Sequence, residues 1–301
     1  MIGNALRRLV RAGRRFELTW RYGFNLAPVL AYKFASHSLS AEANRVVGEL
    51  NRSGVAITSV SDLLGSDSCY PELNQAIAAL EDELRNELSA ARTAANETGK
   101  IGSKTFNREL LGSHPVLDPQ VIYARFALQN PILQIANAYF GMYTRLRYYN
   151  VWHTFATQAE ARESQLWHYD REDRQILKLF VYFSDVDDGA GPFTYADGSH
   201  PKKKLRRLPA SFLEGGVRRS TDQQMAEVVP PEQWIKCTGS KGTIVFADTR
   251  GYHKGAWRAN ATGSCIRVCL LRRLPNHKSS SSLLRQCCCH QTGNNRSHSQ
   301  T

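Results

Sequence analysis

Ile176-Leu-Lys-Leu-Phe-Val-Tyr-Phe-Ser-Asp185 is the longest strongly apolar stretch of this 301-residue chain. The run is interrupted only by Lys178, is too short to span a membrane, and predicts a buried β-strand. Three further segments, 142–155, 243–247 and 265–271, are rich in β-branched, aromatic or apolar residues. Turn signals separate these segments, so the second half of the chain is expected to form a sandwich or barrel of strands.

Helical patterns fill most of the first half of the chain. A helix is expected over 42–51, and apolar residues spaced three or four apart after Pro71 predict a longer one that runs to Ala95. A third helical segment is expected over 118–141, interrupted at Pro131. Helices followed by strands indicate an α+β fold.

The net charge of +12 is unevenly distributed along the chain. Residues 1–33 and 202–219 each carry +6, residues 274–301 carry +3, and the remainder sums to −3. A nearly neutral body argues against a nucleic-acid partner and favours a small-molecule one. The charge pattern gives no indication of an oligomeric state.

Both ends of the chain differ in composition from its centre. Residues 1–40 predict a basic amphipathic extension, interpreted as a helix that docks on the domain. A surface for anionic lipid or nucleic acid and an organelle presequence are the alternatives. Residues 274–301 are polar and Ser-rich and predict a disordered, low-complexity tail. Seven cysteines without framework spacing indicate free thiols in a reducing compartment, here the cytoplasm.

A candidate metal site begins with His168 and Asp170. On an extended segment, residues two apart face the same side, so this pair could offer an imidazole and a carboxylate to one metal ion. His253 follows a short apolar strand at a Gly-flanked turn and is the expected third ligand. Two histidines and a carboxylate suit a non-haem Fe(II) oxygenase, and a zinc hydrolase could use the same set. The alternative is a surface histidine beside a solvated aspartate.

Arg267 stands alone among the apolar residues of segment 265–271 and favours iron over zinc. Burying an arginine is costly without an anionic partner, and the carboxylate of a small dicarboxylic acid would supply one. The alternative places Arg267 on the outward face of an edge strand. Lys178 and Arg258 are the other cations considered for the same role.

Alternation along segment 142–155 places Tyr148, Asn150 and Trp152 on one face of the strand before the metal-binding motif. We expect these side chains to line the pocket or to pack beneath it. Asn150 is assigned to the cosubstrate, and Tyr148, Trp152 and Lys178 are assigned to the substrate.

Residues 201–239 form an expected insert that begins Lys-Lys-Lys-Leu-Arg-Arg at 202–207. A long insert in a compact barrel is often a lid or binding loop. Its basic cluster could contact the phosphates of a coenzyme A thioester, or it could be a solvated loop.

His168-Tyr-Asp170, GAGPFTYADGSHPK at 189–202 and FADTRGYHKG at 246–255, with an arginine on the following strand, resemble the phytanoyl-CoA dioxygenase-like family of Fe(II)/2-oxoglutarate oxygenases. The resemblance covers roughly 50–273. It implies an oxygenase domain over 41–273 with a double-stranded β-helix (jelly roll, cupin-like) core and flanking helices. It also implies that His168, Asp170 and His253 bind the catalytic iron and that Arg267 anchors the distal carboxylate of 2-oxoglutarate.

The function implied by this resemblance is hydroxylation of a small organic substrate, such as an acyl-CoA or another metabolite. O2 and 2-oxoglutarate would be consumed, succinate and CO2 released, and ascorbate would support the reaction. A catalytically idle binding module and an oxygenase acting on a macromolecule are the competing hypotheses. The complete ligand set together with Arg267 favours catalysis.

Overall fold

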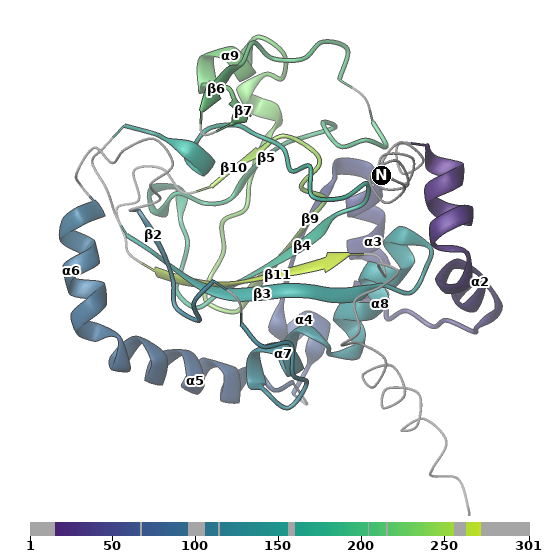
Figure 1. Ribbon diagram of the computed structural model, residues 1–301, viewed down its shortest axis with the longest axis horizontal. Helices are drawn as coiled ribbons and strands as arrows, with labels where there is room; N and C mark the ends of the chain where they lie inside the picture. The colour runs from purple at the N-terminus through teal and green to yellow at the C-terminus, as the bar shows by residue number, and fades with distance from the viewer. Residues whose placement is uncertain are drawn as a thin grey trace, which may run out of the picture.

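Two antiparallel sheets pack face to face in the computed structural model, and helices cover the outer face of the larger sheet (Figure 1). For residues 94–95 and 263–271 the structure describes the backbone alone. It describes residues 16–66, 68–95, 106–113, 115–155, 160–203, 205–214, 216–255 and 263–271.

The larger sheet has six strands in the order β1-β9-β4-β11-β3-β2, all antiparallel. Each of the four segments predicted as strands in the second half of the chain contributes one of them. Its strands are β1 (Val55–Ser59), β2 (Asn107–Glu109), β3 (Arg145–Thr154), β4 (Leu177–Tyr182), β9 (Thr243–Ala247) and β11 (Gly263–Leu271).

Alternation along β4 gives the larger sheet two buried faces. Leu177, Leu179 and Val181 belong to the main core beneath the helices. Phe180 and Tyr182 point the other way and pack with the smaller sheet. Burial on both faces explains why the β4 sequence is nearly continuously apolar.

The smaller sheet has the order β10-β5-β8, and single residue pairs extend it beyond β10. Strand β8 lies within 201–239, which was expected to be an insert, but it pairs with β5 and is therefore part of this sheet. The described strands do not close into a barrel, so the double-stranded β-helix stays a prediction. The strands of this region are β5 (Thr194–Ala196), the hairpin β6 (Phe212–Glu214) and β7 (Val217–Arg219), β8 (Trp234–Lys236) and β10 (His253–Lys254).

The helices confirm the α+β class but correct two predicted boundaries. The helix predicted from Pro71 to Ala95 is divided at Leu84, which has φ −90° and ψ 11°. The segment predicted to become helical at Asp118 begins at Ile122, because Asp118 and Pro119 form a turn in which the Asp118 side chain accepts a hydrogen bond from the Gln120 amide (2.9 Å). The α-helices are α2 (Leu26–Phe34), α3 (Ala41–Ser53), α4 (Val60–Leu64), α5 (Tyr70–Glu83), α6 (Arg85–Ala95), α7 (Ile122–Ala127), α8 (Asn130–Phe140) and α9 (Asp222–Ala226).

Gly54 joins α3 to the edge strand β1, and two features of its surroundings require glycine. It ends the helix in the left-handed conformation, with φ 86°, and its amide bonds the Leu50 carbonyl. A Cβ at this position would lie 2.5 Å from the Tyr195 hydroxyl oxygen. The backbone turn and the approach of the smaller sheet therefore both exclude a side chain here.

The described part of the N-terminal extension is attached to the domain through Trp20. This side chain lies in a short π-helical turn (Thr19–Phe24), is fully buried in the main core, and donates from its indole Nε1 to Asp173 Oδ1 (3.3 Å). Arg21 donates to the carbonyls of Phe140 and Gly141 (3.1 and 3.2 Å). These contacts agree with the docking interpretation of the extension.

The remaining predictions for the two ends fall on residues 1–15 and 274–301, outside the described residues. Among the helices that the structure describes, none combines the length and the apolar character that crossing a membrane requires.

Replacing Trp20 by Ala should lower the free energy of unfolding by about 3–5 kcal/mol, because it removes a fully buried aromatic side chain from the core. Leu18→Ala is the matched control: Leu18 is 71% exposed, so its loss should change stability by about 0.5 kcal/mol or less. Urea unfolding of both variants checks this, and equal effects would contradict the docking interpretation.

Candidate metal centre

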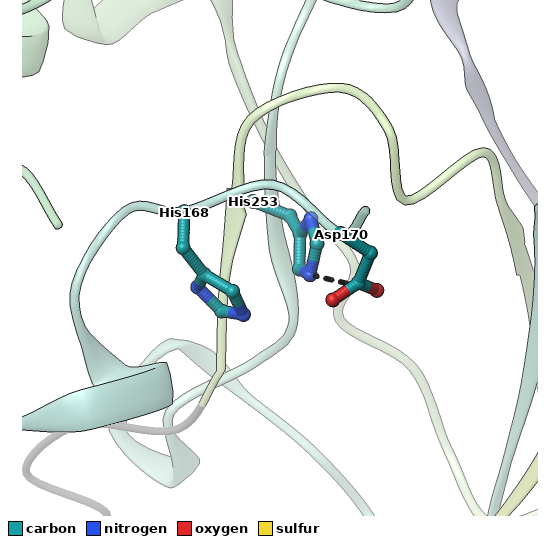
Figure 2. Close-up of side chains that lie close together, drawn as sticks. All are labelled: His168, Asp170 and His253. Carbon is teal, nitrogen blue, oxygen red and sulfur yellow. Dashed lines mark ion pairs between the residues drawn. The ribbon is translucent and has the colours of Figure 1, made fainter. Parts of the chain in front are cut away.

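His168, Asp170 and His253 converge in the structure as the sequence predicted (Figure 2). One potential ligand atom from each residue lies within 4.8 Å of the others. The two imidazole rings have centroids 4.3 Å apart, and His253 Nε2 is 3.9 Å from Asp170 Oδ2. A single cation between the three side chains could contact all of them.

Main-chain hydrogen bonds hold the two contributing segments together. The His168 amide donates to the His253 carbonyl (2.9 Å), and the His253 amide donates to the His168 carbonyl (2.8 Å). The Asp170 amide donates to the Thr249 carbonyl (2.7 Å). The positions of the ligands therefore follow from backbone pairing between segments that are far apart in the sequence.

Backbone carbonyls also select the ring nitrogen that faces the metal position. His168 Nδ1 lies 2.9 Å from the Leu166 carbonyl oxygen, and His253 Nδ1 lies 3.0 Å from that of Gly251. Each carbonyl favours the Nδ1–H tautomer, which leaves Nε2 as the donor atom to a metal. Burial, followed by the neighbouring His253, holds the pKa of His168 well below its usual range, so this ring is kept neutral as a ligand must be.

Asp170 is held by Lys178, whose side chain is completely buried on the inner face of β4. Lys178 Nζ donates to Asp170 Oδ2 (2.6 Å) and to Glu172 Oε1 (2.8 Å). Tyr148 donates its hydroxyl to the same Glu172 oxygen (3.2 Å). The structure thus places Lys178 and Tyr148, both predicted to bind substrate, in a network that positions the Asp170 carboxylate.

A second network fixes the turn before His253, and the sequence analysis missed it. Asp248 is fully buried, pairs with Arg250, whose Nε donates to Oδ1 (2.8 Å), and accepts from the Tyr139 hydroxyl at Oδ2 (2.7 Å). The Tyr195 hydroxyl donates to the Asp248 carbonyl (2.8 Å) and approaches Gly251 so closely that a Cβ there would lie 1.9 Å away. An acidic residue directly after an apolar strand, with arginine two positions on, was the available signal.

Two other predicted pocket residues lie on β3. Asn150 donates from Nδ2 to the Gly112 carbonyl (2.7 Å) and accepts from the Leu111 amide (3.3 Å), so its amide supports the neighbouring loop. Trp152 lines a separate shallow hollow together with Arg108 and Gly112.

Arg267 lies on β11, where the register pairs it with Asn150 on β3 and with Phe180 on β4. Directly paired residues share a face of the sheet, so this position belongs to the inner face. The Phe180 ring contacts the Phe193 ring at a tilt (centroids 4.7 Å apart), and Phe193 stacks on His253 (5.3 Å). The backbone therefore places Arg267 beside Phe180 on the inner face of the larger sheet. The side chain of Arg267 and all of Arg258 lie outside what the structure describes.

Arg219, which the sequence analysis did not single out, lies beside His168. Trp167 and Ser220 exchange both main-chain hydrogen bonds (3.0 and 2.9 Å), which sets Arg219 opposite His168 across the two segments. Arg219 is 5% exposed, and burial lowers the pKa of its guanidinium despite the nearby carboxylates of Glu163, Glu214 and Asp170. The site thus contains two buried cations, Lys178 bonded to Asp170 and Arg219 beside His168.

The donor set fits a first-row divalent metal. Two imidazoles and one carboxylate form the facial arrangement typical of non-haem Fe(II), and the opposite side of such an ion would stay available to other ligands. The carbonyl acceptors at both Nδ1 atoms are the second layer that such ligands usually have.

No protein-family model and no curated protein matches this chain. Among solved structures, EctD from S. alaskensis with 2-oxoglutarate and 5-hydroxyectoine is 16% identical, with a TM-score of 0.52 over 84% of each chain. Its apo form is also 16% identical, with a TM-score of 0.51 over 84% of this chain and 85% of that one. The non-haem alpha-ketoglutarate-dependent carbocyclase SnoK is 18% identical, with a TM-score of 0.49 over 82% and 91%. At these identities, the likeness to EctD shows a shared fold.

Replacing His253 by Ala should weaken Mn(II) binding by on the order of 100-fold or more, because one of three protein ligands is lost. His153→Ala is the control, because His153 lies outside the triad and pairs with Glu81 (2.9 Å). Isothermal titration of both variants measures the change, and similar affinities in the two would argue against the triad.

Proposed function

We propose that this protein is a non-haem Fe(II)/2-oxoglutarate-dependent dioxygenase that hydroxylates a small organic substrate. The convergence of His168, Asp170 and His253 is the observation that carries the proposal. The fold likeness to EctD, a protein solved with 2-oxoglutarate, supports it. The motifs at 168–170, 189–202 and 246–255 support membership in the phytanoyl-CoA dioxygenase-like family.

In this proposal His168 Nε2, His253 Nε2 and the Asp170 carboxylate hold Fe(II) from one side. A centre of this kind couples the oxidation of 2-oxoglutarate by O2, to succinate and CO2, with transfer of one oxygen atom to the substrate. Ascorbate would support the activity. The protein supplies the fixed geometry and a dry environment.

Several residues of the chain contribute to that environment. Lys178 orients the Asp170 carboxylate and compensates its charge. Phe193 covers one face of the His253 ring, and Phe180 continues this apolar wall on the larger sheet. The turn held by Asp248 and Arg250 keeps His253 in place.

Arg267 is the proposed anchor for the distal carboxylate of 2-oxoglutarate. Its register position on the inner face, in the row of Phe180, is compatible with this role. Asn150 lies directly opposite it on β3, and its amide is held by the 111–112 loop, so Asn150 would shape the cosubstrate pocket.

We also propose a cytoplasmic location. Cys69 and Cys237 are free thiols in the structure, which agrees with a reducing compartment. Burial raises the pKa of the Cys237 thiol, so this cysteine is kept protonated.

The activity test supplies Fe(II), 2-oxoglutarate, O2 and ascorbate together with a metabolite library that includes acyl-CoA thioesters, and it measures succinate. The native protein should form succinate, faster with its substrate, and Asp170→Ala should reduce the rate to background because the anionic ligand is lost. Arg108→Ala, at an exposed ion pair with Glu87, is the control. Hydrolysis without O2 consumption in the presence of zinc would instead support a metallohydrolase.

Arg267→Met should raise the Kd of 2-oxoglutarate for the Mn(II)-loaded protein by on the order of 100-fold, because the distal carboxylate loses a charged hydrogen-bonding partner. Binding of Mn(II) itself should be retained. Calorimetric titration of metal and then cosubstrate separates the two effects, and an unchanged Kd for 2-oxoglutarate would assign the anchor to another cation.

A further inference from the structure

Arg219 is a buried cation beside the triad that has no role in the proposed function so far. It ends strand β7 within the 201–239 segment, and the pairing of Trp167 with Ser220 places it opposite His168. His168 is in turn paired with His253. Residues that lie opposite one another in such pairs share a face of the sheet, so Arg219, His168 and His253 form one row across the inner face of the smaller sheet.

The guanidinium of Arg219 lacks the hydrogen bonds that a buried arginine requires. Within the described residues, its Nε and Nη1 atoms are buried and have no hydrogen-bond partner. The nearest described carboxylate pairing, with Glu214 Oε2, is long at 3.9 Å, and that oxygen accepts instead from the Glu163 amide (2.8 Å). Leaving charged donors buried without acceptors is costly, so these N–H groups require an acceptor beyond the described residues.

We propose that Arg219 binds a carboxylate of the organic substrate, so that the enzyme acts on an acid whose anionic end is held next to His168. This inference rests on the proposed function and names the substrate class for the same site. Arg219 would be a specificity-determining residue, with its N–H groups donating to the carboxylate oxygens.

The position of Arg219 separates this carboxylate from those of the cosubstrate. Arg219 ends β7 of the β6-β7 hairpin, which single residue pairs connect to the smaller sheet, whereas Arg267 lies on β11, one of the two central strands of the larger sheet. Two cations on different strands, β7 and β11, would give the substrate and the cosubstrate separate anchors.

The basic cluster that the sequence analysis considered for anionic substrates has other partners. Lys202 Nζ lies 3.8 Å from the centre of the Tyr139 ring and also bonds Asn51. Arg207 is exposed and donates to the Glu227 carbonyl (2.9 Å). Arg219, unlike Lys202 and Arg207, lies opposite His168, and a single buried guanidinium suits one small carboxylate better than a chain of phosphates.

The test uses the full-length protein loaded with Mn(II) and 2-oxoglutarate, so that the cosubstrate site is filled, and hexanoate and hexanamide as matched probes. Calorimetry should show that hexanoate binds more tightly than hexanamide. Arg219→Met should weaken hexanoate binding by on the order of 10- to 100-fold, the range for hydrogen bonds to a charged group, and should remove the preference. Arg219→Lys, which keeps the charge and loses the fork, should retain part of it.

Arg218→Met is the matched control, because Arg218 is the exposed neighbour on the same strand. It should bind hexanoate as the native protein does. Arg219→Met should bind Mn(II) and 2-oxoglutarate with affinities within about twofold of native, which also demonstrates that the variant is folded. A retained preference for hexanoate in Arg219→Met would overturn the proposal. A loss of 2-oxoglutarate binding in Arg219→Met as large as that expected for Arg267→Met would also overturn it.

Binding measurements on native protein, with and without Mn(II), distinguish the failure of this inference from the failure of the proposed function. If native protein binds neither Mn(II) nor 2-oxoglutarate but still prefers hexanoate in an Arg219-dependent way, the oxygenase proposal fails and the carboxylate site stands. If the native protein binds Mn(II) and 2-oxoglutarate but does not distinguish hexanoate from hexanamide, the oxygenase proposal stands and the Arg219 proposal fails.

Discussion

The paired main-chain hydrogen bonds between His168 and His253 are the constraint on which the rest of the site depends. They bring together a segment that precedes β4 and a turn that follows β9. Because the two side chains project from directly opposed backbone positions, the backbone pairing itself brings their imidazole rings into contact. The remaining features, including the carbonyls at both Nδ1 atoms and the buried Asp248, refine an arrangement that the backbone has already set.

The buried charges between the two sheets are organised around this pair. Lys178 neutralises Asp170 from the larger sheet, and Arg250 neutralises Asp248 beneath the turn. Each of these ions has a close partner of opposite charge, as burial demands. Arg219 departs from this pattern in the described part of the chain, and an ion pair of 3.9 Å is a poor substitute for hydrogen bonds.

The sequence predicts those features that depend on local pattern. The apolar run at 176–185 identifies β4, and the spacing of His168 and Asp170 identifies a shared face, because alternation is a property of any strand. It does not predict the break at Leu84, since the apolar spacing continues through it and tertiary packing decides the helix end. Nor does it distinguish Arg219 from its exposed neighbour Arg218: the two differ only in which segment pairs beside them. The role of Lys178 was missed for the same reason, because its partner Asp170 is supplied by another segment.

The order of strands in the larger sheet also has a consequence for synthesis of the protein. Strand β11 is the last of the strands that the structure describes, yet it lies between β3 and β4, and the early strand β1 pairs with the late strand β9. Until residues 263–271 have left the ribosome, β3 and β4 have no partner on facing edges, and unpaired edges invite association with other chains. The sheet is therefore completed only after residues 263–271 are available for pairing, and its many long-range pairings predict slow folding with a period of vulnerability to aggregation.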